Sequence, residues 1–412
     1  MFVHVRAQET VEAAVPLPRR VLARAAAGAF AIAAALTPAT AALGADQERA
    51  EPDVSGPGYS ANQIAAIESV GAALEPGSER ALTHQDAAFI KARFDRVALG
   101  AGDALIVAAA NGTETRRYGA GDVVDGALRA LSVEGDTAVI ELRDDPADGI
   151  TPTARLASYA RGLNEAELDS RPAAAQPSPE SVCGRDDSEH AACYKETDPE
   201  AYDASRSVAR LIIDDQFYCT AWLAEGGNRL LTNNHCFDTD ELAKATEVQF
   251  GYECLECTGG DTATPIKVTG DDVLATDYTY DFTLFTVADY DAIAHLPHLP
   301  IDTGQAATGE KVFIAGHPGG RPLRIAAVTD ESGRARPAAA QCRVSDNTWN
   351  GRGWRTDLAY LCDTEGGSSG SPVVSRETGA VVGLHHLGGC PNSAVRMDLV
   401  YPMISPYLKY DF

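Results

Sequence analysis

The alternation of hydrophobic and polar residues predicts short strands along most of the chain. Ile90, Ala92 and Phe94 alternate with charged residues, which is the period-two pattern of a half-buried strand. The apolar run at 104–109 leads into the turn dipeptide Asn111-Gly112, and residues 137–142 form a further strand signal. We therefore expect a small β-sandwich within residues 46–170.

A second series of short apolar segments separated by turns begins near residue 207. Its members are 207–213, 218–224, 229–232, 282–287, 311–315 and 380–384. Many short strands of this kind predict a β-barrel. Residues 171–182, between the two series, are rich in Pro, Ala and Ser, which is typical of a linker. The pattern predicts an all-β chain in which a β-sandwich domain precedes a barrel domain at 183–412.

The first 45 residues differ from the rest of the chain. Arg19, Arg20 and Arg24 precede an uncharged, alanine-rich stretch, and Ala39-Thr-Ala41 provides the small residues that signal peptidase needs. We predict a secretory signal peptide at residues 1–45. A transmembrane helix is the alternative, but so much alanine gives a weak spanning signal. No membrane contact is expected once the signal is removed.

Composition and cysteine placement narrow the class of protein. The chain has 412 residues with 59 acidic and 34 basic side chains, and its formal net charge of −25 argues against nucleic-acid binding. Its nine cysteines all lie between Cys183 and Cys390. So many cysteines in one region indicate disulfides and an oxidising compartment, extracellular or periplasmic.

Three short segments each contain one residue type needed for nucleophilic catalysis. His235 lies in Leu-Thr-Asn-Asn-His-Cys, Asp281 in Tyr-Asp-Phe-Thr-Leu, and Ser369 in Gly-Gly-Ser-Ser-Gly-Ser-Pro. A serine hydroxyl needs an imidazole base, which in turn needs a buried carboxylate to orient it. The backbone N–H groups of Gly367 and Ser369 would form the oxyanion hole, and glycine permits the tight turn. Each residue alone also fits a loop, core or turn position, so the joint occurrence in this order carries the prediction.

Together these motifs resemble those of chymotrypsin-fold serine proteases, and particularly the bacterial lysyl-endopeptidase branch. That branch has Gly-Ser-Ser-Gly-Ser-Pro at its nucleophile, as 367–372 does here, and Asp-Phe-Thr-Leu at its aspartate, as 281–284 does here. Some secreted relatives also carry a β-sandwich before the protease domain. The resemblance implies a chymotrypsin-like double β-barrel, a monomer without cofactor or metal, and hydrolysis of protein or peptide substrates through an acyl-enzyme on Ser369.

The resemblance also implies how the cysteines pair. The expected disulfides are Cys219–Cys236, Cys183–Cys390 and Cys193–Cys257, with Cys342–Cys362 as a remaining local bridge. Cys254 is then unpaired, although it and Cys257 are interchangeable at this stage. A zinc site on Cys254-x-x-Cys257 competes with this interpretation, but no second C-x-x-C or H-x-x-x-H follows in the chain.

Two aspartates are candidates for substrate recognition. Asp363 stands six residues before Ser369, where trypsin-like enzymes place the carboxylate of the primary specificity pocket. Asp398 stands about where lysyl endopeptidases carry their lysine-recognising aspartate. Either would favour cleavage after Arg or Lys. The alternative is that these carboxylates stay solvated or pair with Arg396.

His386 and Ser368 bear on how the site is supported and activated. His386 stands where similar enzymes place a residue beside the catalytic aspartate, so it is expected to hold Asp281 or bind substrate. A structural histidine, or a metal site on His385-His386, is the alternative. Digestive zymogens have an aspartate at the position of Ser368 that pairs with a new N-terminus, and serine cannot form that ion pair.

The role of the predicted β-sandwich and two other functions stay open at this stage. The sandwich could be a pro-region, a folding aid or a binding module. If the protein is made as an inactive pro-form, the sandwich would control its activity by steric blocking or by assisting folding. A catalytically silent protease-fold binding protein and an esterase on the same scaffold are the competing functions.

Overall fold

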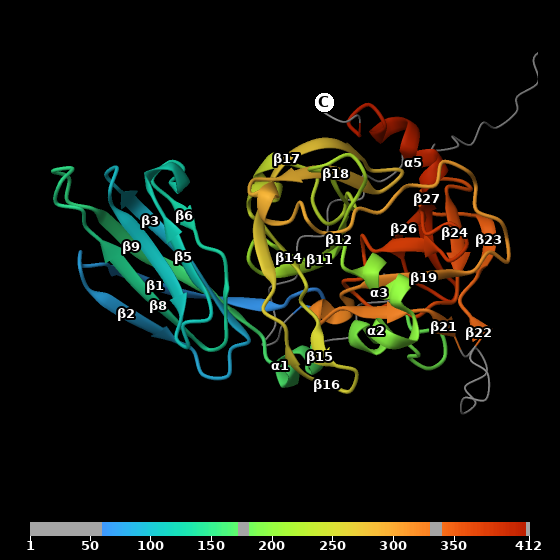
Figure 1. Ribbon diagram of the computed structural model, residues 1–412, viewed down its shortest axis with the longest axis horizontal. Helices are drawn as coiled ribbons and strands as arrows, with labels where there is room; N and C mark the ends of the chain where they lie inside the picture. The colour runs from blue at the N-terminus through green and yellow to red at the C-terminus, as the bar shows by residue number, and fades with distance from the viewer. Residues whose placement is uncertain (1–59, 172–180, 330–339, 409–412) are drawn as a thin grey trace, which may run out of the picture. The chain divides into compact units, whose positions relative to one another are not determined.

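The computed structural model describes residues 60–171, 181–329 and 340–408 (Figure 1). The predicted signal peptide and most of the predicted linker lie outside these residues. The described part of the chain is built mainly of antiparallel strands, which confirms the all-β prediction. Within it, no helix combines the length and apolar character needed to span a membrane.

Residues 60–171, which we call the N-terminal region, contain two antiparallel sheets. The first has the order β1 (Ala65–Ala73), β9 (Thr153–Gly162), β3 (Phe89–Ala98) and β6 (Leu128–Arg129), with β7 (Val133–Glu134) also paired to β3. The second has the order β2 (Glu79–Thr83), β8 (Thr137–Arg143), β4 (Ala104–Ala109) and β5 (Thr115–Tyr118). The turn η1 (Ala120–Asp122) and the helix α1 (Glu165–Asp169) complete the region.

One hydrophobic cluster joins the two sheets of the N-terminal region. It includes Ile90 and Phe94 from β3, Leu105 from β4 and Ile140 from β8. The apolar positions of the alternating pattern therefore face a shared core, as the period of two requires. Lys91, a polar position in the same pattern, is buried as well. Its ammonium group pairs with the carboxylates of Asp215 and Glu247, which lie outside the N-terminal region.

Residues 208–287 contain a closed six-stranded barrel. Its strands are, in order around the barrel, β11 (Val208–Ile213), β12 (Phe217–Leu223), β13 (Leu230–Thr232), β18 (Phe282–Val287), β17 (Ile266–Asp277) and β14 (Thr246–Phe250). The short helix α4 (Asp240–Lys244) precedes β14, and β15 (Cys254–Glu256) pairs with β16 (Gly259–Thr262) outside the barrel. Closure leaves no unpaired barrel edge.

An eight-stranded antiparallel sheet lies beside the barrel. Its order is β10 (Glu189–His190), β20 (Arg324–Ala326), β19 (Val312–Gly316), β25 (Pro372–Ser375), β26 (Val381–Leu387), β27 (Asn392–Arg396), β24 (Asp357–Tyr360) and β23 (Val344–Trp349). The strands β21 (Val328–Thr329) and β22 (Ala340–Gln341) form a separate pair. The remaining elements are η2 (Ala191–Cys193), α2 (Tyr194–Thr197), α3 (Pro199–Ser205), η3 (Tyr290–Ala292), η4 (Pro318–Gly320) and α5 (Met397–Ile404).

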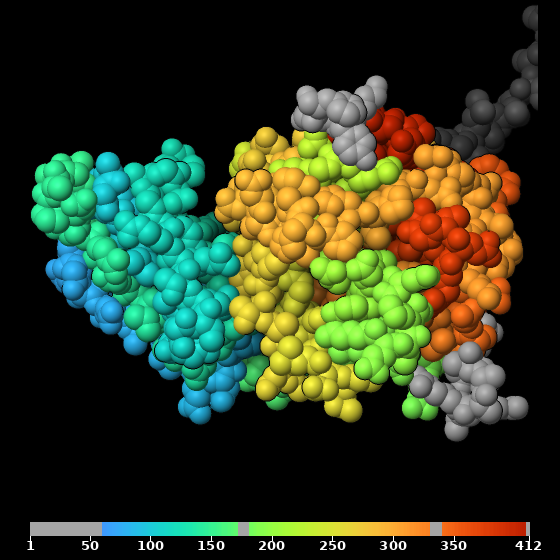
Figure 2. Space-filling model, in the orientation of Figure 1, coloured from blue at the N-terminus to red at the C-terminus, as the bar shows by residue number. Residues whose placement is uncertain are grey.

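A single apolar cluster fills the space between the barrel and the eight-stranded sheet. It contains Trp222 and Phe282 from the barrel strands and Phe313, Val374 and Leu384 from the sheet. The segment from η2 to α3, light green in Figure 2, also contributes residues to this cluster. Each fully buried side chain of this size contributes about 1.5–3 kcal/mol through the hydrophobic effect. Residues of β13, β18 and β25 all contribute to this cluster. It therefore holds together the C-terminal end of β13 and the N-terminal ends of β18 and β25, next to which the candidate site lies.

Charged side chains of the N-terminal region are buried against the barrel. Lys91 Nζ lies 2.8 Å from Glu247 Oε2 on β14, and Lys267 Nζ on β17 lies 2.8 Å from Glu114 Oε1. These four side chains are at most 5 % exposed. Burial would raise the pKa of Glu247, but the charges of Lys91 and Lys267 outweigh it and hold the pKa far below its usual range. Removing one partner of such a pair costs about 3–5 kcal/mol.

Candidate active site

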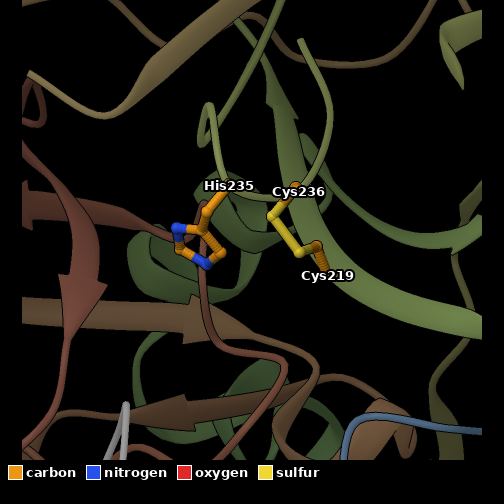
Figure 3. Close-up of side chains that lie close together, drawn as sticks. All are labelled: Cys219, His235 and Cys236. Atoms are coloured by element: carbon orange, nitrogen blue, oxygen red, sulfur yellow. A yellow bond between two sulfur atoms is a disulfide. The ribbon is translucent and has the colours of Figure 1, made fainter. Parts of the chain in front are cut away.

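His235 is held at the end of β13 by a disulfide. Cys236 is bonded to Cys219 of β12, so the loop carrying the histidine is tied to the barrel wall (Figure 3). The ligand atoms of Cys219, His235 and Cys236 lie within 4.8 Å of one another. Both sulfurs belong to the disulfide, and a metal needs thiolate ligands, so this group is not a metal site.

Asp281 occupies the tight turn between β17 and β18. Its φ of +46° lies in the left-handed region, which places its carboxylate beneath the histidine loop. Asn233 Nδ2 donates to the carbonyl of Asp281 at 2.8 Å. The backbone N–H of His235 donates to Asp281 Oδ1 at 3.0 Å, and His235 Nδ1 donates to Oδ2 at 2.8 Å. Since a carboxylate only accepts, this contact assigns the proton of the neutral imidazole to Nδ1.

Ser369 meets the other side of the imidazole. Its Oγ lies 2.8 Å from His235 Nε2, which is free to accept the hydroxyl proton once Nδ1 carries the ring hydrogen. The carbonyl of Ser369 accepts a hydrogen bond from Thr220 N–H at 2.8 Å, which anchors the serine to β12. His235, Asp281 and Ser369, predicted from three separate motifs, are therefore in hydrogen-bond contact.

The loop before Ser369 contains a glycine in the left-handed backbone region. Gly367 has a φ of +101°, and a Cβ at this position would lie 2.1 Å from Cε2 of Tyr218. The carbonyl of Gly366 accepts from Gly319 N–H at 2.7 Å. A peptide group is planar and trans, so the N–H of Gly367 points to the side opposite that carbonyl. Glycine is required here both for conformation and for space.

A second histidine and a second carboxylate extend the series behind Asp281. His386 Nδ1 lies 3.0 Å from Asp281 Oδ2, and its Nε2 lies 2.7 Å from Asp357 Oδ2. Both ring nitrogens face carboxylate oxygens, so both must donate and the ring is an imidazolium. Burial alone would lower the pKa of His386, but the hydrogen bonds and charges of Asp281 and Asp357 raise it to about 9.

Further polar groups complete the surroundings of the two carboxylates. Asp357 accepts from Ser393 Oγ at 2.7 Å and from Thr356 Oγ1 at 2.9 Å. Arg352 Nη1 lies 3.2 Å from Asp281 Oδ1. Burial would raise the pKa of Asp281, but the charges and hydrogen bonds of His235 and His386 hold it far below the usual range. The carboxyl group of Asp281 is therefore ionised at neutral and at moderately acidic pH.

Sequence reasoning expected His386 but missed Asp357 and Arg352. The only local signal for Asp357 is an acidic residue at the start of the buried strand β24. A buried carboxylate needs a cationic or hydrogen-bonding partner, but the partner lies 29 positions further along the chain. Arg352 lies in the loop before β24, and no motif marks it.

The two aspartates expected to recognise substrate both have partners. Asp363 is buried and accepts from the backbone N–H of Cys183 at 2.8 Å and of Asp187 at 2.7 Å. Burial raises the pKa of Asp363 to about 6, although those two hydrogen bonds oppose the shift. A cavity of about 80 Å³ beside it is also lined by Ser368, Arg321 and Arg324. The lining also includes Asp186, 3.5 Å from Arg324, and Glu365, 3.8 Å from Arg321, so both guanidinium groups at this cavity have acidic partners.

Asp398 lies at the start of α5 and forms the ion pair that was the alternative expectation. Arg396 donates to it through Nε at 3.0 Å and through Nη2 at 2.6 Å. This is a two-point pair between a guanidinium and a carboxylate. The structure thus brings together the three catalytic candidates and His386, while Asp363 lines a cavity with Ser368 and Asp398 is paired with Arg396.

The cysteines follow the expected pattern with one exception. The disulfides Cys183–Cys390, Cys193–Cys257 and Cys219–Cys236 are present, and Cys254 is free. Because Cys257 is bonded, Cys254-x-x-Cys257 does not offer two thiolates to zinc.

The expected bridge between Cys342 and Cys362 is wrong. Both cysteines are free and buried. Burial, and then the hydrogen bond with Cys342, raise the pKa of Cys362 well above its usual value. A buried thiol that keeps its proton is a poor nucleophile in thiol–disulfide exchange.

Comparison with known proteins agrees with this geometry. Residues 219–384 match the family model of the trypsin-like peptidase domain, and the match contains His235, Asp281 and Ser369. The chain is 29 % identical over 334 residues to secreted RxLR effector protein 73 of Plasmopara viticola, covering 78 % of this chain and 80 % of that protein.

Two solved protease structures are partly similar to the chain. The active form of the Rv3671c protease from M. tuberculosis has 16 % identity and a TM-score of 0.37, covering 52 % of this chain and 85 % of that one. A Glu endopeptidase in complex with MPD has 20 % identity and a TM-score of 0.38, covering 55 % and 98 %. The family match shows that residues 219–384 are similar to the trypsin-like peptidase domain.

Proposed function

We propose that this protein is a secreted serine endopeptidase that hydrolyses peptide bonds through an acyl-enzyme on Ser369. The observation that carries the proposal is the continuous hydrogen-bond series from Ser369 Oγ through His235 to Asp281, with both contacts at 2.8 Å. This geometry is the one that converts a serine hydroxyl into a nucleophile at neutral pH.

The chemistry follows from the positions of these atoms. His235 Nε2 takes the Ser369 hydroxyl proton while Oγ attacks the peptide carbonyl carbon, and the carbonyl oxygen becomes an oxyanion facing the N–H groups of Gly367 and Ser369. The imidazolium then gives its proton to the leaving amine, and the acyl-enzyme remains. A water molecule repeats the same steps, releases the acid and restores Ser369.

Asp281 and His386 have supporting roles in this proposal. Asp281 fixes the tautomer and orientation of His235 and stabilises the imidazolium that forms in each step. Protonated His386 keeps the Asp281 carboxylate ionised and in place, with Asp357 as its counter-charge. Neither group exchanges a proton with the substrate.

The proposal includes cleavage after Arg or Lys. Of the two candidate aspartates, Asp398 is favoured, because its partner is the side chain of Arg396, which a substrate cation can displace. Asp363 is held by two backbone N–H groups that cannot move away. Mapping cleavage sites of the wild-type protein on a peptide library tests this part, and preference for Leu or Glu before the cut would contradict it.

Secretion to the cell exterior or the periplasm is also part of the proposal. It is supported by three disulfides, which persist in oxidising compartments, and by a relative that is named as a secreted effector. We propose that the mature protein is a monomer and begins after residue 45. N-terminal sequencing and sizing of protein recovered from the medium or periplasm test both statements.

The decisive experiment is labelling of the protein with a fluorophosphonate probe, with peptide and ester substrates assayed in parallel. A serine endopeptidase is labelled at Ser369 and cleaves both substrates. Turnover of esters alone would indicate an esterase, and absence of labelling and turnover would indicate a catalytically silent binding protein. Ser368→Ala is the matched control, because that neighbouring hydroxyl is not the one facing His235.

A further inference from the structure

The guanidinium of Arg171 joins the N-terminal region to the loop that carries Gly319. Arg171 Nη2 donates to the carbonyl of Gly319 at 3.1 Å, and Nη1 donates to the carbonyl of Gln63 and to Tyr218 Oη, both at 3.0 Å. Its Nε donates to the carbonyl of Leu168 at 3.0 Å. All three guanidinium nitrogens are therefore committed, which fixes the orientation of this forked side chain.

Tyr218, one of these partners, packs directly on the oxyanion loop. It belongs to β12 and is 4 % exposed, and its ring occupies the space that a Cβ on Gly367 would need. Its hydroxyl donates to the carbonyl of Ala61 at 3.1 Å, and Arg171 lies 5.2 Å from the ring centroid. The ring that limits the position of Gly367 is thus held from the N-terminal region.

Gly319, the other partner, controls the peptide group that carries the first oxyanion donor. While Arg171 holds the carbonyl of Gly319, the N–H of the same residue donates to the carbonyl of Gly366 at 2.7 Å. That bond orients the planar peptide between Gly366 and Gly367, and so directs the Gly367 N–H away from Gly319. Two routes therefore lead from Arg171 to the same oxyanion donor.

We infer that Arg171 is a positioning residue for the oxyanion hole, and that the N-terminal region is a permanent part of the catalytic unit rather than a segment removed on activation. The inference rests on the proposed function. It also supplies a support for the oxyanion loop in a chain whose Ser368 cannot form an ion pair with a new N-terminus.

The contact between the N-terminal region and the barrel is built to persist. Glu247 is 0 % exposed and accepts from Lys91 at 2.8 Å, from the Ser132 backbone N–H at 2.9 Å and from Ser132 Oγ at 2.6 Å. A buried carboxylate with this many partners fixes one orientation of the two surfaces, because any shift would leave a charge desolvated and unpaired. Arg171 is thereby presented to Gly319 in a constant position.

The test is Arg171→Ala in the full chain, compared with the wild type in peptide hydrolysis. We expect kcat to fall by about 10- to 100-fold, less than the 10²–10³ lost when an oxyanion donor itself is removed, with KM changed by less than about threefold. Millimolar guanidinium chloride, far below denaturing concentration, should restore part of kcat. Arg155→Ala is the matched control, because that arginine pairs with Asp95 inside the N-terminal region.

A second measurement works without any activity. Hydrogen–deuterium exchange of peptides covering residues 364–371 should be faster in Arg171→Ala than in the wild type, while exchange in the barrel strands stays the same. Should Arg171→Ala fail to fold, Arg171→Lys, which keeps the charge but not the fork, carries the same test with a smaller expected effect.

The outcomes separate this inference from the proposed function. An inactive wild type would refute the proposed function, and the exchange experiment would still decide the role of Arg171. Wild-type kcat together with wild-type exchange in the Arg171 variant would overturn the inference. So would a loss of kcat that guanidinium does not restore and that comes with faster exchange throughout the barrel, because that pattern is general destabilisation.

Discussion

Loss of the proton from His386 at alkaline pH should lower both the stability and the catalytic activity of the protein. Its imidazolium lies between the carboxylates of Asp281 and Asp357, and all three side chains are fully buried. The pKa rises from an ordinary value of 6.5 to about 9 in the folded protein. A shift of this size corresponds to about 3 kcal/mol of folding free energy.

The sign of this effect follows from the direction of the shift. Because the folded-state pKa is the higher one, the contribution of His386 is fully present below pH 6.5, the unfolded value, and is lost as pH rises through about 9. The free energy of unfolding should therefore fall by about 3 kcal/mol over this range on account of this one group. Replacing His386 removes the dependence and, by leaving two buried carboxylates without their shared cation, costs about 3–5 kcal/mol at pH 6.

The measurement is urea unfolding of the wild type and His386→Gln at half-unit steps from pH 6 to pH 9.5. Groups common to both proteins titrate alike, so the difference between the two curves isolates His386. That difference should shrink as pH rises, and kcat of the wild type should decline with an alkaline limb near pH 9. His295→Gln, at an exposed histidine, is the control and should follow the wild type. Parallel stability curves for the wild type and His386→Gln would refute the reasoning.

Three further changes test the site. Ser369→Ala should abolish fluorophosphonate labelling and lower kcat by at least about 10⁴-fold with an unchanged thermal transition; activity surviving in this variant would reassign the nucleophile. Gly367→Ala should lower kcat by about 10²–10³-fold, because the Cβ would collide with Tyr218; normal turnover would show that this loop tolerates a side chain. Asp363→Asn should remove the pH dependence that this buried carboxyl contributes: because its folded-state pKa is raised to about 6 from 3.8, the wild type should lose up to about 3 kcal/mol of unfolding free energy relative to the variant as pH rises from about 4 to about 6, measured by urea titration; parallel pH curves would contradict this.

Local sequence patterns accounted for nine of the 27 described strands and for the three catalytic candidates. Alternation at 90–94 predicted a strand because successive side chains face opposite sides of a sheet, and β3 covers those residues. His235, Asp281 and Ser369 were found for a similar reason, since each needs particular neighbours within its own turn. Glycines around Ser369 are an example, because only they allow the φ that Gly367 adopts.

Contacts between segments that are distant in the chain could not be predicted from the sequence. The hydrogen bonds that Asp363 accepts from backbone donors 180 and 176 positions earlier could not be predicted, because any residue type supplies such donors. Cys342 and Cys362 were expected to bond because they were left over, yet both are free in the buried core, where burial raises the pKa of the Cys362 thiol.

By itself, then, the sequence determined the all-β class and the three motifs that carry His235, Asp281 and Ser369, because period-two alternation and tight turns are properties of neighbouring residues. Only the tertiary structure decided what else supports those motifs: Asp357, the second carboxylate that makes His386 an imidazolium, and Arg171 on the carbonyl of Gly319, 148 positions away. The reason is physical. A buried charged group needs a hydrogen-bonding or oppositely charged partner. Packing of the hydrophobic cores determines which residue lies close enough to be that partner, and this residue is often distant in the sequence.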